Sequence, residues 1–323
     1  MFLSHGSSVQ CIDPIPAMHK TDGMDFAIIE AFVAVVEFGG FTRAAEALHL
    51  SQPALSRRIG LLEHELRHPV LERGRRGVRL TEAGRTFLPH AQAAIACLRD
   101  GAAAVEALEQ GGAGSLALAI VGTLAGTGVT SQLARFHEEH PRLRVILRTG
   151  NSAEVSALVR RGEAALGLRY SLDGAADLVS SNLYTERLIV VAASGHSLAD
   201  TKRIEPERLR GQPWVAFPPR RGATPDSFGQ VLRQRLAAAG LDEAEIVVID
   251  SLTAQKRLVE AGFGLALVPV SSVQEELELR TLTRLDVPAM EASVDVTLIH
   301  RKGAFLGTGA RRLMEMLGET SEG

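Results

Sequence analysis

His64, Glu65 and His68 match the H-E-x-x-H pattern of zinc peptidases. On a helix, two histidines at this spacing share a face and can bind zinc, while the glutamate between them acts as a general base. Counted at about 100° per residue from Leu55, however, both histidines fall away from the apolar stripe and face outward. Pro69 disfavours helical geometry at His68, and no third ligand follows at the spacing of a zinc peptidase. We therefore expect no metal here, and interpret the histidines as solvated or phosphate-facing.

The elements that position this segment form a predicted helix-turn-helix. Helical spacing of apolar residues predicts a first helix from Asp25, and a short second helix has Phe41 or Thr42 as its N-cap. A third helix opens with Ser51, a favoured N-cap, and with Pro53 in its first turn. Two helices joined by a tight turn place the second one in a DNA groove. The buried stripe of the third helix consists of Leu55, Ile59, Leu62 and Leu66.

The outward face of the third helix carries side chains suited to DNA. Gln52 can form two hydrogen bonds to an adenine edge, and Arg57 can bind guanine or a phosphate. Ser56 can contact a base or a phosphate, and Gly60 permits close approach of the backbone. This combination predicts a nucleic-acid-binding face.

Two short strands joined by an Arg/Gly turn follow Pro69 and predict a β-hairpin wing. Arg73, Arg75 and Arg76 at its tip could lie along a phosphate backbone or enter a minor groove. A solvated loop is the alternative for such a turn. The local patch is basic, although the whole chain has a net charge of -3.

The bulk properties are those of an ordinary globular protein with more than one domain. The chain has 323 residues, 46% of them hydrophobic and 23% charged, and contains no apolar run of the roughly 18 to 20 residues that span a bilayer. Cys11 and Cys97 suggest no disulfide framework. Residues 1–23 lack the regions of a secretory signal and are interpreted as a disordered or wrongly assigned extension. We therefore expect a cytoplasmic protein without a membrane partner.

A long helix is predicted from Thr81, a candidate N-cap, to Gly111 and Gly112, with a bend at Pro89. Its apolar residues alternate at spacings of three and four, the pattern of helices that pair with a twin. Packing within the domain's own core would give the same stripe, so both interpretations stay open. The candidate dimerisation residues are Leu88, Ala91, Ile95, Leu98, Ala102 and Val105.

Beyond this helix, apolar strands alternate with capped helices and predict two α/β subdomains with largely parallel sheets. The strands expected in the first series are 116–121, 143–149 and 164–168, with helices at 128–140 and 152–161. The second series has strands 188–193, 214–217, 245–249 and 264–268, with helices at 225–239 and 252–261. A last strand and helix are expected at 294–300 and 304–317.

The stretches "FTRAAEALHLSQPALSRRIGLLEHEL" and "LERGRRGVRLTEAGRTFLPHA" resemble the DNA-binding domain and linker of LysR-type transcriptional regulators. The order F-T-x-A-A, S-Q-P-A-L-S, L-E-x-x-L, E-R and L-T-x-A-G carries the resemblance. Arg67 and His68 stand where the family usually shows Leu-Gly, and Val70 and Leu71 where it shows Leu-Phe. The end of the helix and the packing of the wing are therefore expected to differ slightly.

The resemblance implies an all-α winged helix-turn-helix at 24–80, a linker and dimerisation helix at 81–112, and an effector domain of periplasmic-binding-protein type. That domain would have two Rossmann-like subdomains, 113–187 with 288–318, and 188–287. A dimer or tetramer, an operator in double-stranded DNA, a small effector and RNA polymerase are the implied partners. The implied DNA contacts are Thr42, Arg43, Gln52, Pro53, Ser56 and Arg57, with Arg73, Arg75 and Arg76 on the backbone.

Ligands of such folds sit at the carboxyl ends of strands and at helix N-termini. Thr123 and Asn151 suit a carboxylate, and the resemblance favours both as effector contacts, while Arg169 or Arg220 could pair with the charge. These groups together predict a small organic anion as effector. The alternative is that the hydroxyl and amide groups only cap helices. The candidate contacts are Thr123, Asn151, Arg169, Phe217, Pro218 and Arg220.

An enzyme is the rival interpretation of the α/β region. Gly122, Gly126 and Gly128 follow a strand but miss the dinucleotide-binding spacing, and neither cysteine has the partners of a nucleophile. A transport-type binding protein would need export and would leave the helix-turn-helix unexplained. We therefore expect a transcriptional regulator without catalytic residues and without a cofactor.

Overall fold

The structure is a computed structural model and describes residues 25–74, 77–109, 114–126, 128–218 and 228–319. The chain divides into two compact units, an N-terminal unit, Met1–Ile95, and a C-terminal unit, Ala96–Gly323. The boundary falls inside the long helix α4, Glu82–Glu109.

The N-terminal unit contains the predicted helix-turn-helix. Asp25 caps α1, and Ser51 caps α3 by accepting a hydrogen bond from the Ala54 N–H at 3.3 Å. The expected N-cap of α2 was wrong: Gly40 takes that position, because Phe41 already has helical geometry and its side chain is buried. Leu55, Ile59 and Leu62 are buried as predicted. The helices are α1 Phe26–Glu37, α2 Phe41–Ala47 and α3 Gln52–Leu66.

Helix α3 ends at Leu66, and Arg67 follows in the left-handed conformation with φ 54°. The chain therefore leaves the helix before His68, so His64 and His68 do not share a helical face. Both histidines are exposed. The geometry that a zinc peptidase motif needs is not formed.

The predicted wing is an antiparallel hairpin of β1, Leu71–Gly74, and β2, Gly77–Leu80. Glu63 holds its start by accepting a hydrogen bond from the Val70 N–H at 2.9 Å. Thr81 holds its end, since its hydroxyl donates to the Pro69 carbonyl at 2.7 Å and accepts from the Gly84 N–H at 2.9 Å. A Cβ atom on Gly84 would lie 2.0 Å from the Val70 carbonyl oxygen. Glu63, Thr81 and Gly84 therefore stabilise the position of the wing against the helices.

Helix α4 uses its apolar stripe in two ways. Ala91 and Ile95 are buried in the core of the N-terminal unit, and Leu88 packs against that core. In the second half, Leu98 is 58% exposed and Val105 59% exposed. Packing within the chain's own core thus accounts for the first half of the stripe, while Leu98, Ala102 and Val105 face outward. Thr81 caps the helix as predicted, and Gly111 and Gly112 lie outside the described residues.

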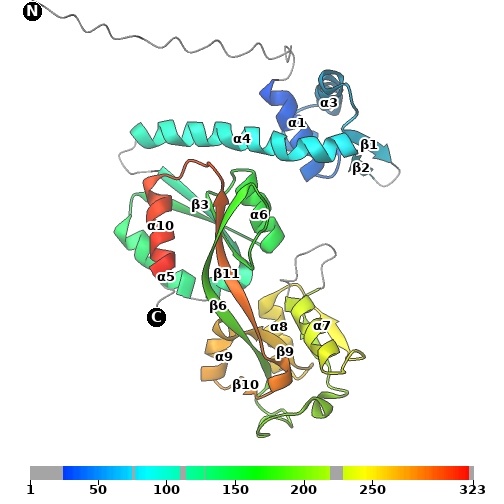
Figure 1. The fold of residues 1–323 in the computed structure, drawn as a ribbon, viewed down its shortest axis with the longest axis vertical. Helices are drawn as coiled ribbons and strands as arrows, with labels where there is room; N and C mark the ends of the chain where they lie inside the picture. The colour runs from blue at the N-terminus through cyan, green and yellow to red at the C-terminus, as the bar shows by residue number, and fades with distance from the viewer. Residues whose placement is uncertain (1–24, 75–76, 110–113, 127, 219–227, 320–323) are drawn as a thin grey trace, which may run out of the picture. The chain divides into compact units, whose positions relative to one another are not determined.

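A seven-stranded sheet runs through the C-terminal unit in the order β10-β6-β11-β5-β3-β4, with β9 paired to β6. The expectation of largely parallel sheets was wrong for this sheet. Only β3 with its neighbours β4 and β5 is parallel, whereas β6 and β11 run antiparallel to each other and join the two subdomains (Figure 1). The bounds are β3 Gly114–Val121, β4 Leu143–Gly150, β5 Leu166–Tyr170, β6 Leu178–Ala193 and β11 Ala292–Arg301.

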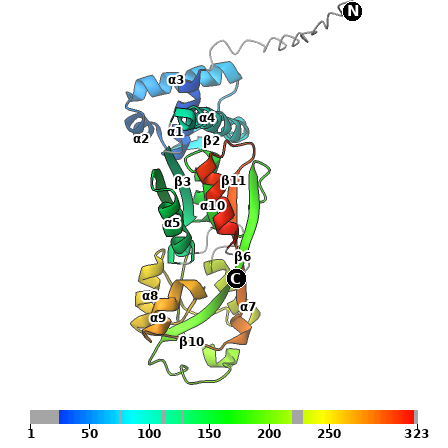
Figure 2. The ribbon, with the colours of Figure 1, turned by 90° about the vertical axis from the view of Figure 1, so that its left-hand side faces the viewer.

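Helix α6, Ser152–Arg160, packs on the sheet of the first subdomain, and α5, Gly128–Glu139, packs beside α10, Thr308–Glu319 (Figure 2). The second subdomain adds a parallel pair, β7 and β8. The sequence missed α9 and β10, which are short. The remaining bounds are β7 Trp214–Ala216, α7 Phe228–Ala238, β8 Ile246–Val248, α8 Leu252–Glu260, β9 Ala266–Pro269, α9 Gln274–Glu278 and β10 Leu282–Leu285.

Candidate functional site

The outward face of α3, together with the start of α2, presents polar and basic side chains to solvent. Most of the predicted contacts are exposed, and Ser56 is half-buried. A Cβ atom added to Gly60 would meet no other atom within 4 Å, so this face is open. Arg73 belongs to β1, and Arg75 and Arg76 lie outside the described residues. The exposed residues are Thr42, Arg43, Gln52, Pro53 and Arg57.

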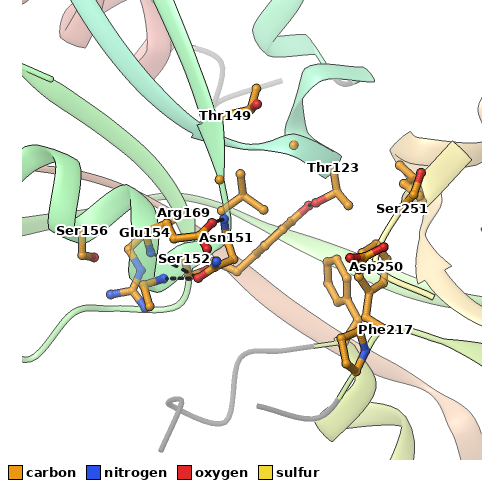
Figure 3. A pocket seen from close by; sticks show the side chains of 18 of the residues that line it. Thr123, Thr149, Asn151, Ser152, Glu154, Ser156, Arg169, Phe217, Asp250 and Ser251 are labelled. Carbon is orange, nitrogen blue, oxygen red and sulfur yellow. Dashed lines mark hydrogen bonds between the residues drawn. The ribbon is translucent and has the colours of Figure 1, made fainter. Parts of the chain in front are cut away.

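A cavity of about 700 Å³ lies within the C-terminal unit, between the two subdomains. Figure 3 shows Asn151, Ser152 and Arg169 on one side of it, and Phe217, Asp250 and Ser251 on the other. The walls are the ends of strands β3, β4 and β5 and the starts of α6 and α8, as the fold predicts. Of the six predicted effector contacts, the cavity brings five together, and Arg220 lies outside the described residues. Those five are Thr123, Asn151, Arg169, Phe217 and Pro218.

Asn151 is the N-cap of α6, as the alternative interpretation proposed. Its Oδ1 accepts hydrogen bonds from the N–H groups of Ala153 at 3.0 Å and Glu154 at 3.2 Å. The Glu154 carboxylate in return accepts from the Asn151 N–H at 2.9 Å and completes a capping box. The Nδ2 group of Asn151 is buried and has no hydrogen-bond partner among the described residues. Capping therefore leaves the amide donor available to a ligand.

Arg169 is 3% exposed and forms an ion pair with Asp173 at 2.7 Å. Arg160, which also lines the cavity, pairs with the same carboxylate at 3.2 Å. Burial alone would raise the pKa of Asp173, but the nearby Ser156 hydroxyl, a hydrogen bond from the Ala175 N–H at 3.1 Å and the charges of Arg160 and Arg169 hold that pKa below its usual value. An anion that binds Arg169 must therefore compete with a bound carboxylate.

Thr123 lies in the short 3-10 helix η1, Gly122–Gly126, directly after β3. Its hydroxyl forms a hydrogen bond of 2.9 Å with the Tyr170 hydroxyl, and both residues line the cavity. Burial and the nearby carboxyl of Glu186 raise the pKa of Tyr170 well above its usual value. Tyr170 was missed, although it directly follows Arg169, because the strand predicted at 164–168 ends in the structure two residues later, at Tyr170.

Aromatic side chains form the apolar part of the cavity. The ring of Phe228 lies edge-on to Tyr170 at 4.7 Å between centroids and contacts Phe217 at 6.4 Å. Phe228 begins α7 and follows residues 219–227, which are not described. No local pattern in the sequence indicates Phe228 as a cavity residue, because its place in the cavity depends on how α7 packs.

Comparison with known proteins settles the class of this chain. Residues 26–85 match the model described as "Bacterial regulatory helix-turn-helix protein, lysR family", and residues 109–322 match "LysR substrate binding domain". The second match alone covers more than half of the 323 residues. The chain belongs to the LysR family. It is a DNA-binding transcriptional regulator rather than an enzyme.

Curated relatives in the LysR family align along most of their own length. The HTH-type transcriptional regulator TfdS of Cupriavidus pinatubonensis (strain JMP 134 / LMG 1197) is 30% identical over 292 residues, which are 84% of this chain and 97% of the relative. The regulator CitR of Bacillus subtilis (strain 168) is 26% identical over 268 residues, 83% of this chain and 90% of the relative.

Solved structures agree with the LysR assignment. The crystal structure of CbnR, a LysR family transcriptional regulator, matches with a TM-score of 0.62 and 25% identity, covering 93% of this chain and 100% of that one. Full-length CbnR in complex with its target DNA matches with a TM-score of 0.59 and 24% identity, with 92% and 100% coverage, and shows the same fold. The described part of the LysR-type chain has no helix long and apolar enough to cross a membrane. Nor does that part bring together three His, Cys, Asp or Glu side chains that could hold a metal ion.

Proposed function

We propose that this LysR-type regulator binds a small organic anion in the cavity of the C-terminal unit, and that binding changes its hold on operator DNA. The Nδ2 donor of Asn151 carries this proposal, because it is buried at the cavity and has no hydrogen-bond partner in the part of the chain that the structure describes. A buried amide donor that lacks an acceptor is unfavourable by about 1–3 kcal/mol, and a carboxylate oxygen would relieve that cost.

The charges of the cavity favour one orientation of the anion. Arg169 lies near Asn151, whereas Asp250 lies on the other wall beside Phe217 (Figure 3). Arg160, which shares the Asp173 carboxylate with Arg169, also lines the cavity. A carboxylate is therefore favoured near Asn151, and the rest of the ligand near the aromatic rings. A hydrogen-bond donor at the far end of the ligand would suit Asp250.

Helix α6 offers a route from the cavity to the linker helix. It begins beside the cavity at Asn151, and at its other end the Arg161 carbonyl accepts a hydrogen bond from Arg99 of α4 at 2.8 Å. Arg301 strengthens this connection: it donates to both carboxylate oxygens of Asp100 on α4 at 2.7 Å and to the Val159 carbonyl at 3.1 Å. A shift of α6 on ligand binding would thus act on α4.

The regulator is proposed to work as a homodimer or a dimer of dimers in the cytoplasm, where it would meet operator DNA and RNA polymerase. The exposed half of the linker stripe, Leu98, Ala102 and Val105, supports pairing with a second copy, because such residues gain from burial. The exposed Gln52 and Arg57 support reading of bases in a major groove.

Thermal denaturation of the purified full chain with a set of small carboxylates and their uncharged amides tests the ligand site. Saturable stabilisation by a carboxylate is expected in the wild type. The variant Asn151→Asp keeps an oxygen that can cap α6 but replaces the donor by a negative charge, so this stabilisation should be lost. Asn151→Ser is the matched variant, because it keeps both a capping oxygen and a donor without adding charge.

Loss of the response in Asn151→Asp with partial retention in Asn151→Ser would support the proposed site. An equal response in the wild type and in both variants would contradict it. A set of carboxylates that never shifts the melting temperature of the wild type would contradict the anionic ligand itself.

A further inference from the structure

A chain of hydroxyl and carboxyl groups leads from the cavity into the protein. Thr123 and Tyr170 form its first link at 2.9 Å, and the side chains of Tyr170 and Glu186 interact. The Glu186 Oε2 atom is buried and has no hydrogen-bond partner among the described residues, so it is open to the Tyr170 hydroxyl. Glu186 is 6% exposed and lies on β6, one of the two strands that join the subdomains. The backbone and the hydroxyl of Ser271, in the 3-10 helix Val270–Val273 of the second subdomain, both donate to its carboxylate. Buried side chains of Tyr170 and Glu186 therefore lie behind Thr123, and the sequence analysis did not identify either of them.

The protonation state of Glu186 decides the direction of these hydrogen bonds. A threonine or tyrosine hydroxyl has only one hydrogen to donate. When Glu186 is ionised it can only accept, so Tyr170 donates to it and Thr123 donates to Tyr170. Thr123 then offers only oxygen lone pairs to the cavity, which repel a carboxylate. When Glu186 is protonated it can donate to Tyr170, Tyr170 can donate to Thr123, and the Thr123 hydroxyl hydrogen becomes available to a ligand.

We propose that Glu186 is a positioning residue that sets whether Thr123 donates to, or accepts from, the ligand in the cavity. This inference rests on the proposed function, because it assumes that the ligand binds beside Thr123. Glu186 does not itself line the cavity and acts only through Tyr170. A bound carboxylate would favour the protonated Glu186, and a ligand that donates a hydrogen bond would favour the ionised form.

The surroundings of Glu186 move its ionisation into the range near neutral pH, so that both forms are populated there. Burial raises the pKa of Glu186 to about 7, although the hydrogen bonds from Ser271 and the interaction with Tyr170 lower it. Tyr170 reaches it from β5 and Ser271 from the second subdomain, and across the ladder it faces Val294 of β11, which is apolar. Tyr184, two residues back on β6, acts on Tyr170. None of these groups supplies a positive charge, so burial has the largest effect and the pKa of Glu186 rises.

Calorimetric titration of the full chain with phenylacetate between pH 6 and pH 9 tests this inference, with phenylacetamide as the uncharged comparison. Phenylacetate stays ionised throughout, so a change in its affinity reports on the protein. In the wild type its dissociation constant is expected to rise about tenfold per pH unit above the pKa of Glu186. The dissociation constant of the amide, which can donate as well as accept, should change far less.

Four variants separate this mechanism from a structural role. Glu186→Gln can donate to Tyr170 at every pH, and Tyr170→Phe frees Thr123 from its partner, so both should bind phenylacetate with a flat pH profile. Glu278→Gln removes a carboxyl from an exposed position on α9 and should keep the wild-type profile. Thr123→Val should weaken phenylacetate binding at pH 6, where the wild type binds best.

The outcomes distinguish the inference from the proposed function. Flat profiles in Glu186→Gln and Tyr170→Phe, with the wild-type slope in Glu278→Gln, would support the inference. Binding that Thr123→Val weakens, but whose pH profile is the same in the wild type and in Glu186→Gln, would overturn the role of Glu186 and leave the ligand site intact. Absence of phenylacetate binding to the wild type, or binding that Thr123→Val leaves unchanged, would contradict the carboxylate site and overturn the inference with it.

Discussion

The two candidate sites of this regulator are built in opposite ways. The DNA-binding face of α3 consists of exposed side chains such as Gln52 and Arg57, projected from a helix whose other side is buried. In the cavity, Thr123 is hydrogen-bonded to Tyr170, and Arg169 forms an ion pair with Asp173. A DNA contact therefore needs only a correctly placed helix, whereas a ligand must also replace or rearrange these existing interactions. We expect DNA affinity to depend on single exposed side chains, and ligand affinity to depend also on the residues that hold the cavity side chains in place.

The largest effect is expected from Gly84→Ala, which separates the stability of the two units. The new Cβ atom would lie 2.0 Å from the Val70 carbonyl oxygen, so the backbone between the wing and α4 would have to move. We expect the N-terminal unit to lose about 3 kcal/mol or more of unfolding free energy. Operator affinity should fall, while ligand-induced stabilisation of the C-terminal unit remains. Chemical denaturation followed by circular dichroism measures the loss.

Gly101→Ala is the control for that substitution. Gly101 is an exposed position of α4 with no atom within 4 Å of an added Cβ atom, and alanine is favoured inside a helix by roughly 0.5–1 kcal/mol. It should stabilise the chain slightly. Equal destabilisation by both substitutions would contradict the close contact at Gly84.

The next effect concerns the pH dependence of stability. Glu186 has a pKa of about 7 in the folded chain, above the usual value of 4.5, so the folded state binds more protons than the unfolded state between these two pH values. Stability should therefore fall as pH rises from about 4.5 to about 7, by up to about 3 kcal/mol. Glu186→Gln should remove this slope. A denaturation series at closely spaced pH values measures it, and an unchanged slope in the variant would contradict the buried neutral carboxyl.

The two sites also differ in how much of each could be predicted from the sequence. The helix-turn-helix and the outward face of α3 follow from local periodicity and capping, so their residues were placed correctly, except for the N-cap of α2. The cavity was predicted only in part. Asn151 and Thr123 stand at strand ends that periodicity identifies, whereas Tyr170, Asp173 and Phe228 depend on contacts between distant elements. The first half of β6 was missed because its polar residues are stabilised by pairing with β11, more than a hundred residues later.

A smaller loss of stability is expected when the hydrogen bonds of Arg301 between α6 and α4 are removed. Arg301 is largely buried and bonds both Asp100 and Val159. Arg301→Gln should reduce stability by roughly 1–3 kcal/mol. It should also reduce the effect of a bound ligand on DNA affinity while leaving ligand affinity nearly unchanged. Parallel titrations of ligand and DNA check this, and Arg311→Gln at an exposed position of α10 serves as control. Equal loss of ligand affinity and coupling would count against the proposed route.

A similar effect on DNA affinity alone is expected from Arg57→Ala. Loss of a base contact should weaken binding to the operator by about 1–3 kcal/mol, with little change in stability because Arg57 is exposed. Binding to scrambled DNA should weaken less. Fluorescence anisotropy with both DNAs checks the difference, and an unchanged operator affinity would remove Arg57 from the contact set.

The smallest effect is expected from Arg67→Gly. Arg67 adopts the left-handed conformation after α3, where glycine avoids a steric cost of about 1–2 kcal/mol but gains more freedom in the unfolded chain. We expect a net stabilisation below about 1 kcal/mol, measured by the denaturation midpoint. A clear destabilisation would indicate that the Arg67 side chain supports the helix end or the wing.

The central claim is that this chain is a regulator whose hold on specific DNA depends on the ligand bound in its cavity. The most direct test titrates labelled DNA from the region upstream of its own gene, and a scrambled control, with and without a carboxylate found in the thermal screen. We predict tight binding to the upstream DNA that weakens as salt rises, and that the carboxylate changes in the wild type but not in Asn151→Asp. Equal binding to both DNAs, or the same ligand effect in the wild type and in Asn151→Asp, would contradict the account.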